Sequence, residues 1–294
     1  MRLGKTHKKT TPDKKLILER QMVGLAQMLV LDQNKCTGCR DCQIICPAEA
    51  ISSSEAIVED GSLKEPIRMD IDPDLCHFCG QCAIICPTKA ILWRENQEVI
   101  PTLISNGTFP ILDEGIDIQI EKCRVDCQLV CAKTCPVEAL TVKVYHDTDL
   151  DEDRISDIEV DKASCFYCHK CEKACPYDAI EIHSARQGIA IFLPENCLEG
   201  CHACTEVCPS GALRLENEQV TLDETSCIFC RACQNVCPVD KAIEIRREKI
   251  RHHPASSRLW DEIVGKLVSK AAKARLLGET ASHKRERAFR TRID

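Results

Sequence analysis

Six short blocks of four cysteines, each followed by a proline, organise this 294-residue sequence. The blocks use all 24 cysteines, so no thiol is left for a disulfide or a separate catalytic cysteine. The first three blocks are Cys36, Cys39, Cys42, Cys46; Cys76, Cys79, Cys82, Cys86; and Cys123, Cys127, Cys131, Cys135. The last three are Cys165, Cys168, Cys171, Cys175; Cys197, Cys201, Cys204, Cys208; and Cys227, Cys230, Cys233, Cys237.

The spacing within the blocks indicates iron–sulfur clusters. Blocks one, two, four and six read C-x2-C-x2-C-x3-C-P, the run found in bacterial ferredoxins. Three cysteines spaced three apart lie on a curled loop around one face of a cubane, and the fourth ligates the cluster of a partner block. Zinc ribbons instead use two separated C-x2-C pairs. The sequence therefore predicts six [4Fe–4S] clusters and blocks that act in pairs.

Three local features leave alternatives open. Blocks three and five contain longer spacers, which indicate either a lengthened loop around an ordinary cluster or a cluster of altered potential. The run Cys165-x-x-Cys168-His169 matches a haem attachment pattern, but it lies inside a full ferredoxin run. His77 and His202, like His169, lie within cysteine loops, where they either tune a cluster or fill the loop surface.

Short runs with β-branched residues flank each block, and a proline and a helical turn follow its last cysteine. We therefore predict an α+β fold of tandem ferredoxin-type modules, with short strands, short helices and a C-terminal amphipathic helix. The sequence also leaves open a nested pairing of the blocks, in which one module is inserted in another. Consecutive pairing predicts a basic segment 1–27, module 1 at 28–95, a linker at 96–115, module 2 at 116–184, module 3 at 188–247 and a basic end at 248–294.

Consecutive pairing also predicts the ligand sets. Cys36, Cys39, Cys42 and Cys86 are expected to hold one cluster of module 1. Cys76, Cys79, Cys82 and Cys46 are expected to hold the other. The remaining four clusters follow the same exchange between partner blocks.

The charge is uneven along the chain. The whole sequence is −7, but residues 1–20 are +5 and residues 246–294 are +8, which leaves −20 for residues 21–245. Each oxidised cubane with four thiolates adds about −2. An acidic body argues against nucleic acid as a partner and favours docking to basic patches on redox proteins. With 6 Phe, 3 Tyr and 2 Trp, a single large core is not expected.

The C-terminal region has helical periodicity over 258–277, with Ser257 as a candidate N-cap and Gly278 as a candidate stop. Such a helix could pack on its own chain, dock to a larger assembly or lie on a membrane surface. The basic run 284–292 is expected to be a solvated tail or to contact an acidic partner. No run of 18 apolar residues and no export signal is present, so we expect a cytoplasmic protein without a transmembrane segment.

No nucleotide-binding, P-loop or hydrolytic motif accompanies the cysteines. The chain is therefore expected not to be an enzyme by itself but an electron-transfer subunit. Two other hypotheses are an active site at a modified cluster, which would need an open iron position, and cluster storage, which would need labile clusters. Four cysteines in every block argue against the first, and paired modules argue against the second.

The six blocks resemble a polyferredoxin over residues 28–247. Within that class, PIRMDIDPDLCHFCGQCAIICPTKAI and EVIPTLISNGTFPILDEGIDIQIEKC are similar to the polyferredoxin family that belongs to archaeal formylmethanofuran dehydrogenase, although that family usually carries more clusters. The resemblance implies electron transfer to or from a pterin-dependent enzyme of CO2 reduction in methanogenesis. It also implies a hetero-oligomeric complex with formylmethanofuran dehydrogenase subunits, heterodisulfide reductase or hydrogenase. The alternative is a hydrogenase- or heterodisulfide reductase-attached polyferredoxin, or a freely diffusing carrier.

Overall fold

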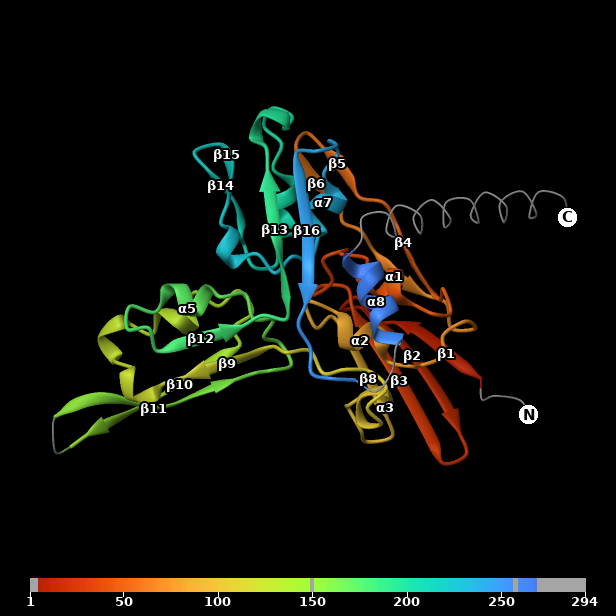
Figure 1. Ribbon diagram of the computed structural model, residues 1–294, viewed down its shortest axis with the longest axis horizontal. Coiled ribbons are helices and arrows are strands. Elements are labelled where there is room, and N and C mark those ends of the chain that lie inside the picture. Colours follow the sequence, from red (N-terminus) through yellow and green to blue (C-terminus); the bar gives the residue numbers. More distant parts are fainter. Residues whose placement is uncertain (1–4, 149–150, 256–258, 269–294) are drawn as a thin grey trace, which may run out of the picture.

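Three lobes meet at the centre of the molecule, and each lobe contains two consecutive cysteine blocks (Figure 1). The structure is a computed structural model that describes residues 5–148, 151–255 and 259–268. In these ranges, no helix is both long and apolar enough to cross a lipid bilayer. We refer to the lobes as modules 1, 2 and 3 in chain order.

Module 1 contains a four-stranded antiparallel sheet in the order β1-β2-β3-β8. The strands are β1 (Thr6–Thr10), β2 (Lys15–Met22), β3 (Leu25–Asp32) and β8 (Ile91–Glu95). Two short ladders pair β4 (Ile51–Ser53) with β7 (Met69–Ile71) and β5 (Ile57–Glu59) with β6 (Ser62–Glu65). The helices α1 (Asp41–Ile45) and α2 (Gln81–Ile85) lie within the two cysteine blocks.

Within the basic segment expected over 1–27, residues 6–27 contribute β1, β2 and the start of β3 to this sheet. Strand β2 alternates inward and outward side chains, and Leu16 and Leu18 are only 4% and 0% exposed. Met22 pairs with Leu25, so Val23 and Gly24 form the two-residue turn to β3, and Gly24 has φ +75°. The alternating pattern in β2 therefore outweighs the basic composition of the segment.

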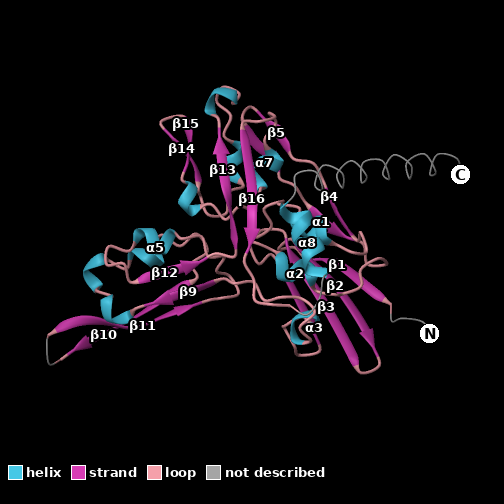
Figure 2. Cartoon of the chain, in the orientation of Figure 1, coloured by secondary structure: helices cyan, strands magenta, loops and turns pink. Residues whose placement is uncertain are grey.

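Module 2 is formed by two antiparallel pairs. Strand β9 (Gly115–Ile118) pairs with β12 (Ile180–His183), and β10 (Leu140–Asp147) pairs with β11 (Glu152–Val160) in a long projecting ribbon (Figure 2). The helical segments are η1 (Ile120–Lys122), η2 (Val125–Cys127), α4 (Val130–Lys133) and α5 (Lys170–Ala174).

Module 3 repeats this plan. Strand β13 (Arg186–Phe192) pairs with β16 (Ile243–Ile250), and β14 (Leu213–Glu216) pairs with β15 (Gln219–Leu222). The helical segments are η3 (Pro194–Asn196), α6 (Ala203–Glu206), η4 (Glu224–Ser226) and α7 (Ala232–Val236).

The ladders join consecutive blocks. In each module, the strand before the first block pairs with the strand after the second, as in β3–β8, β9–β12 and β13–β16. Between the two blocks, the strand that follows the first block pairs with the strand that precedes the second block, as in β4–β7, β10–β11 and β14–β15. This double exchange brings the two cysteine loops of a module face to face.

The C-terminal helix α8 (Leu259–Val268) packs against α1 of module 1 and β16 of module 3. Its buried residues Trp260, Ile263 and Leu267 contact a cluster that includes Ile45 of α1 and Ile85 of α2. The linker between modules 1 and 2 joins the same cluster after α3 (Thr102–Ser105), because the Phe109 ring lies 5.0 Å from the Trp260 ring, edge to face. The rest of the expected helix and the basic tail lie outside the described residues.

Candidate iron–sulfur sites

The cysteines gather in sets of four that mix the two blocks of a module. We number each set, site 1 to site 6, by the block that supplies its first three cysteines, and the partner block supplies the fourth. At four sites, all four cysteines line one small apolar cavity. These sets are Cys76, Cys79, Cys82, Cys46 at site 2; Cys123, Cys127, Cys131, Cys175 at site 3; Cys165, Cys168, Cys171, Cys135 at site 4; and Cys227, Cys230, Cys233, Cys208 at site 6.

Electrostatic interactions identify the same exchange at the remaining two sites. At site 1, burial is the main cause that raises the pKa of Cys36, Cys39 and Cys42, and the negative charge of Cys86 contributes at all three. Asp41 contributes more than Cys86 at Cys39, and Cys82 contributes more at Cys42. At site 5, burial and the charges of Cys237, Cys197 and Cys201 raise the pKa of Cys204. The six sites therefore use all 24 cysteines of the chain once each.

The thiols surround a space rather than a point. Within the described residues, no three Cys, His, Asp or Glu side chains converge as closely as the ligands of a single metal ion do. A cubane holds its four thiolates farther apart than one tetrahedral zinc ion does. The four-cysteine cavities therefore fit a [4Fe–4S] cluster better than a zinc ion.

Left-handed backbone positions curl each cysteine loop. Gly38, Phe78, Tyr167 and Phe229 occupy the position before the second cysteine in the four regular blocks, and each has a positive φ between 51° and 72°. Such turns direct successive N–H groups toward the concave side of a loop, where they stabilise negative charge. In block six, the Phe229 N–H donates to Cys227 Sγ at 3.4 Å.

At Gly38, space rather than conformation requires a glycine, because aromatic residues adopt the same conformation in the other three blocks. A Cβ atom on Gly38 would lie 2.6 Å from Cβ of Ile67, which is closer than real Cβ contacts. Ile67 is only 2% exposed and has little room to move.

A second set of backbone donors follows the last cysteine of a block. Ala50, Ala90, Ala139 and Ala179 each donate an N–H to the sulfur four residues earlier, at 3.2–3.4 Å. Each alanine follows a residue with positive φ, and each is at most 3% exposed. The sequence carries this signal as a repeated C-P-x-x-A, but the role of the alanine becomes visible only in three dimensions.

The two irregular blocks accommodate their extra residues in different ways. In block three, the short helix η2 ends at Cys127, and Gln128 and Leu129 both take left-handed conformations before α4. In block five, Gly200 has φ +71° immediately before Cys201. Site 3 keeps its four cysteines around one cavity despite the longer loop.

Burial makes free thiolates costly at these sites. Desolvation raises the pKa of Cys36 and Cys227 to about 11, and that of Cys171 and Cys230 to about 12. Without a positive counter-charge, such thiols stay protonated at neutral pH. Iron in a cluster supplies that charge, so the cysteines fit metal ligation better than a free-thiol role.

Two of the histidines in the cysteine loops make hydrogen bonds with protein groups. His169 contacts Glu172 Oε2 at 2.6 Å through Nδ1 and Ser184 Oγ at 3.1 Å through Nε2. His202 contacts the carbonyl of Gly200 at 3.1 Å and Ser62 Oγ at 3.2 Å. These contacts favour the interpretation that both side chains fill and fix the loop surface.

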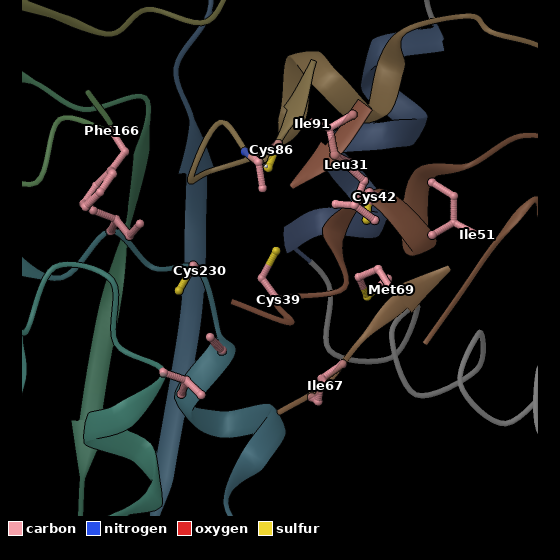
Figure 3. Close-up of a cluster of buried hydrophobic side chains, with 14 of the residues drawn as sticks. Leu31, Cys39, Cys42, Ile51, Ile67, Met69, Cys86, Ile91, Phe166 and Cys230 are labelled. Carbon is pink, nitrogen blue, oxygen red and sulfur yellow. Dashed lines mark hydrogen bonds between the residues drawn. The ribbon is translucent and has the colours of Figure 1, made fainter. Parts of the chain in front are cut away.

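Sites 1, 4 and 6 face the centre of the molecule. Figure 3 shows Cys39 and Cys86 of site 1 and Cys230 of site 6 in one buried cluster with Phe166 from the loop of site 4. A cleft between the modules is lined by Cys36, Cys208 and Phe166, which belong to these same three sites. Sites 2, 3 and 5 are the second cluster sites of modules 1, 2 and 3, respectively.

The fold and the cysteine sets define an iron–sulfur electron-transfer protein built from repeated ferredoxin-like modules, a polyferredoxin. The model of the 4Fe-4S dicluster domain matches residues 35–90, 122–179, 164–212 and 196–241. These ranges cover more than half of the sequence, and the chain belongs to this family.

A solved structure shares nearly the whole fold. The chain is similar to a chain of the formate dehydrogenase–heterodisulfide reductase–formylmethanofuran dehydrogenase complex from Methanospirillum hungatei. The two are 26% identical, with a TM-score of 0.76, over 92% of this chain and 93% of that chain.

Two curated relatives match a shorter part of the sequence. NADH-quinone oxidoreductase subunit I 2 of Symbiobacterium thermophilum is 24% identical over 31% of this chain and 36% of its own length. The protein of the same name from Geobacter metallireducens is 26% identical over 29% of this chain and 69% of its own length. The first match thus spans little more than a third of that relative.

Proposed function

We propose that this chain is the electron-conducting subunit of an oxidoreductase complex and carries six [4Fe–4S] clusters, one at each numbered site. All 24 cysteines act as ligands, and the chain has no catalytic site of its own. The observation that carries the proposal is the exchange of the fourth cysteine in each module, which creates two adjacent cluster sites from two blocks.

The chain's residues prepare these sites for reversible electron transfer. When bound, each cluster takes up and releases one electron. The curled loops hold four thiols around an apolar cavity, and backbone N–H groups donate to cysteine sulfurs such as Cys86 and Cys135. These donors offset part of the added negative charge and raise the potential of the site they face.

The arrangement of sites supports a branched conductor. Each module pairs one inner site, 1, 4 or 6, with one outer site, 2, 3 or 5. Residues of the three inner sites line one cleft, and we propose that an electron entering at one outer site crosses this junction to reach another. We propose that the outer sites are the contact points for other redox subunits.

We propose a complex of the formylmethanofuran dehydrogenase type, which functions in CO2 reduction during methanogenesis. The near-complete match to a chain of the Methanospirillum hungatei complex supports this assignment over a hydrogenase-attached or freely diffusing polyferredoxin. The relatives of the NADH-quinone oxidoreductase type match less than a third of the sequence.

Anoxic purification of the full chain from its source tests the assignment. We expect co-elution with a pterin-dependent catalytic subunit and with heterodisulfide reductase subunits. Elution as a single chain with intact clusters would contradict a fixed subunit and favour the mobile carrier. Co-elution with a hydrogenase alone would contradict the formylmethanofuran dehydrogenase assignment.

A further inference from the structure

A fully buried ion pair connects the loops of two inner sites that belong to different modules. Arg247 of β16 and Asp41 of α1 are both 0% exposed in their side chains. Arg247 Nη1 donates to Asp41 Oδ1 at 2.9 Å, and Nη2 lies 2.8 Å from Oδ2. The pair thus combines one charge-assisted hydrogen bond with a second close charge contact, because the Nη2–Oδ2 contact lacks hydrogen-bond geometry.

The same guanidinium also contacts the loop of site 6. Arg247 Nε donates to the carbonyl of Phe229 at 2.6 Å, and Nη2 donates to the carbonyl of Cys230 at 3.1 Å. Asp41 lies between Cys39 and Cys42 of site 1 in the sequence. Arg247 is therefore in direct contact with both cysteine loops.

A neighbouring side chain strengthens this junction. Asn235 of α7 donates its amide N–H groups to the carbonyls of Gly38 at 2.9 Å and Cys39 at 3.1 Å. The loops of sites 1 and 6 are thus joined by an ion pair and by two further hydrogen bonds.

The charges at this junction are not balanced by protein groups alone. Arg231 is 3% exposed and lies near Arg247, so two buried cations accompany the single buried carboxylate of Asp41. A buried unpaired charge is costly. Clusters at sites 1 and 6 would each contribute about −2 and would balance the excess.

We infer that Arg247 and Asp41 are positioning residues that set the relative potentials of the clusters at sites 1 and 6 and hold the two loops at a fixed separation. The charge of Arg247 acts on Cys39 and on Cys230, so it favours the reduced form at both sites. The charge of Asp41 acts on Cys39 and opposes reduction mainly at site 1. The pair therefore controls electron passage between modules 1 and 3.

Redox titration of charge variants tests this inference, which rests on the proposed function because it requires bound clusters. The full chain is reconstituted without oxygen, its iron and sulfide are counted, and midpoint potentials are followed by electron paramagnetic resonance. We expect Arg247→Gln to lower two of the potentials and Asp41→Asn to raise one. Arg247→Lys keeps the charge and should shift the potentials less than Arg247→Gln does.

A matched pair of controls is available just beyond the end of the same strand. Arg251 donates through Nε and Nη2 to Asp113, away from the cysteine loops. Arg251→Gln and Asp113→Asn change the net charge by the same amounts and should leave all potentials at the wild-type values.

The outcomes separate the two claims. A wild-type chain without sulfide overturns the proposed function. A wild-type chain with clusters, whose Arg247→Gln and Asp41→Asn variants shift in the same direction or not at all, overturns the inference. If Arg247→Gln loses its clusters, the other two variants decide. A purely structural role predicts no upward shift of a potential in Asp41→Asn, and it predicts that Arg247→Lys loses its clusters as well.

Discussion

At the scale of single residues, each site depends on one cysteine from the partner block. Cys46 belongs to block one but lines the cavity of site 2 with Cys76, Cys79 and Cys82. Its sulfur also accepts the N–H of Ala50 at 3.3 Å, which fixes its position on the short turn after α1. A block is therefore not the same as a site, and removing the fourth cysteine of one block should damage the cluster site of the partner block.

Cys46→Ala should damage the cluster at site 2 and spare the cluster at site 1. Site 2 loses a thiolate, whereas Cys36, Cys39, Cys42 and Cys86 are all retained at site 1. Iron content and electron paramagnetic resonance of the anoxic protein measure the loss. Cys86→Ala is the reciprocal control and should affect site 1; selective loss at site 1 in Cys46→Ala would refute the exchange.

The identity of the cysteines could be predicted from the sequence, but their surroundings could not. Motif spacing specifies the sulfur ligands because the cluster has a fixed shape. The N–H donors of Ala90 and Ala139 depend on the left-handed residues before them, Lys89 and Glu138. A charged residue in that conformation has no strong sequence signal, unlike glycine.

At the scale of elements, the short strands beside the cysteine blocks follow from alternation and β-branching, and the structure has strands at these places. The strands β1 and β2 are harder to predict because their few apolar residues, Leu16 and Leu18 among them, stand in a basic context. The described part of the C-terminal periodicity, α8, packs against modules 1 and 3, which favours packing on its own chain over a role in docking.

Trp260→Ala should destabilise the packing of α8 by about 3–5 kcal/mol, because it removes a large buried side chain from the cluster with Phe109. Chemical denaturation of the anoxic protein, followed by far-ultraviolet circular dichroism, measures the change. Lys266→Ala on the exposed face of the same helix should stay within about 0.5 kcal/mol of wild type. Equal effects of the two substitutions would contradict the packing of α8 on module 1.

A second element-scale prediction concerns the contact between α5 and the end of β15. Burial alone would raise the pKa of Asp223, but hydrogen bonds from Lys173, Thr225 and Ser226 hold it well below its usual range. A carboxylate whose pKa is lower in the folded than in the unfolded protein stabilises the fold at every pH above its unfolded pKa of about 3.9. This contribution is lost only as the pH falls through the pKa of the folded state.

Asp223→Asn should therefore cost about 1 kcal/mol, and the cost should be the same at about pH 6 and about pH 8. The modest size reflects the 55% exposure of the Lys173 side chain, which screens the pair. Denaturation at the two pH values measures it. A cost that grows steeply between these values would show that Asp223 titrates there, contrary to its lowered pKa.

At the scale of the whole molecule, the sequence predicts paired modules but leaves consecutive and nested pairing open. The strand ladders join consecutive blocks, and the contacts between modules form over large sequence separations, such as the 206 positions between Asp41 and Arg247. Such contacts have no local signature, because each partner looks like an ordinary surface charge in the sequence. The meeting of sites 1, 4 and 6 could be recognised only in three dimensions.

The proposed function requires that one chain holds six cubanes in mixed four-cysteine sites. The decisive measurement is the iron, sulfide and zinc content of the full chain purified without oxygen, together with its Mössbauer spectrum. We expect about 24 iron and about 24 sulfide per chain, all in [4Fe–4S] form, and no stoichiometric zinc. A protein filled with zinc and lacking sulfide would contradict six cubanes. An intact protein with enough iron for only some of the six sites would contradict them as well.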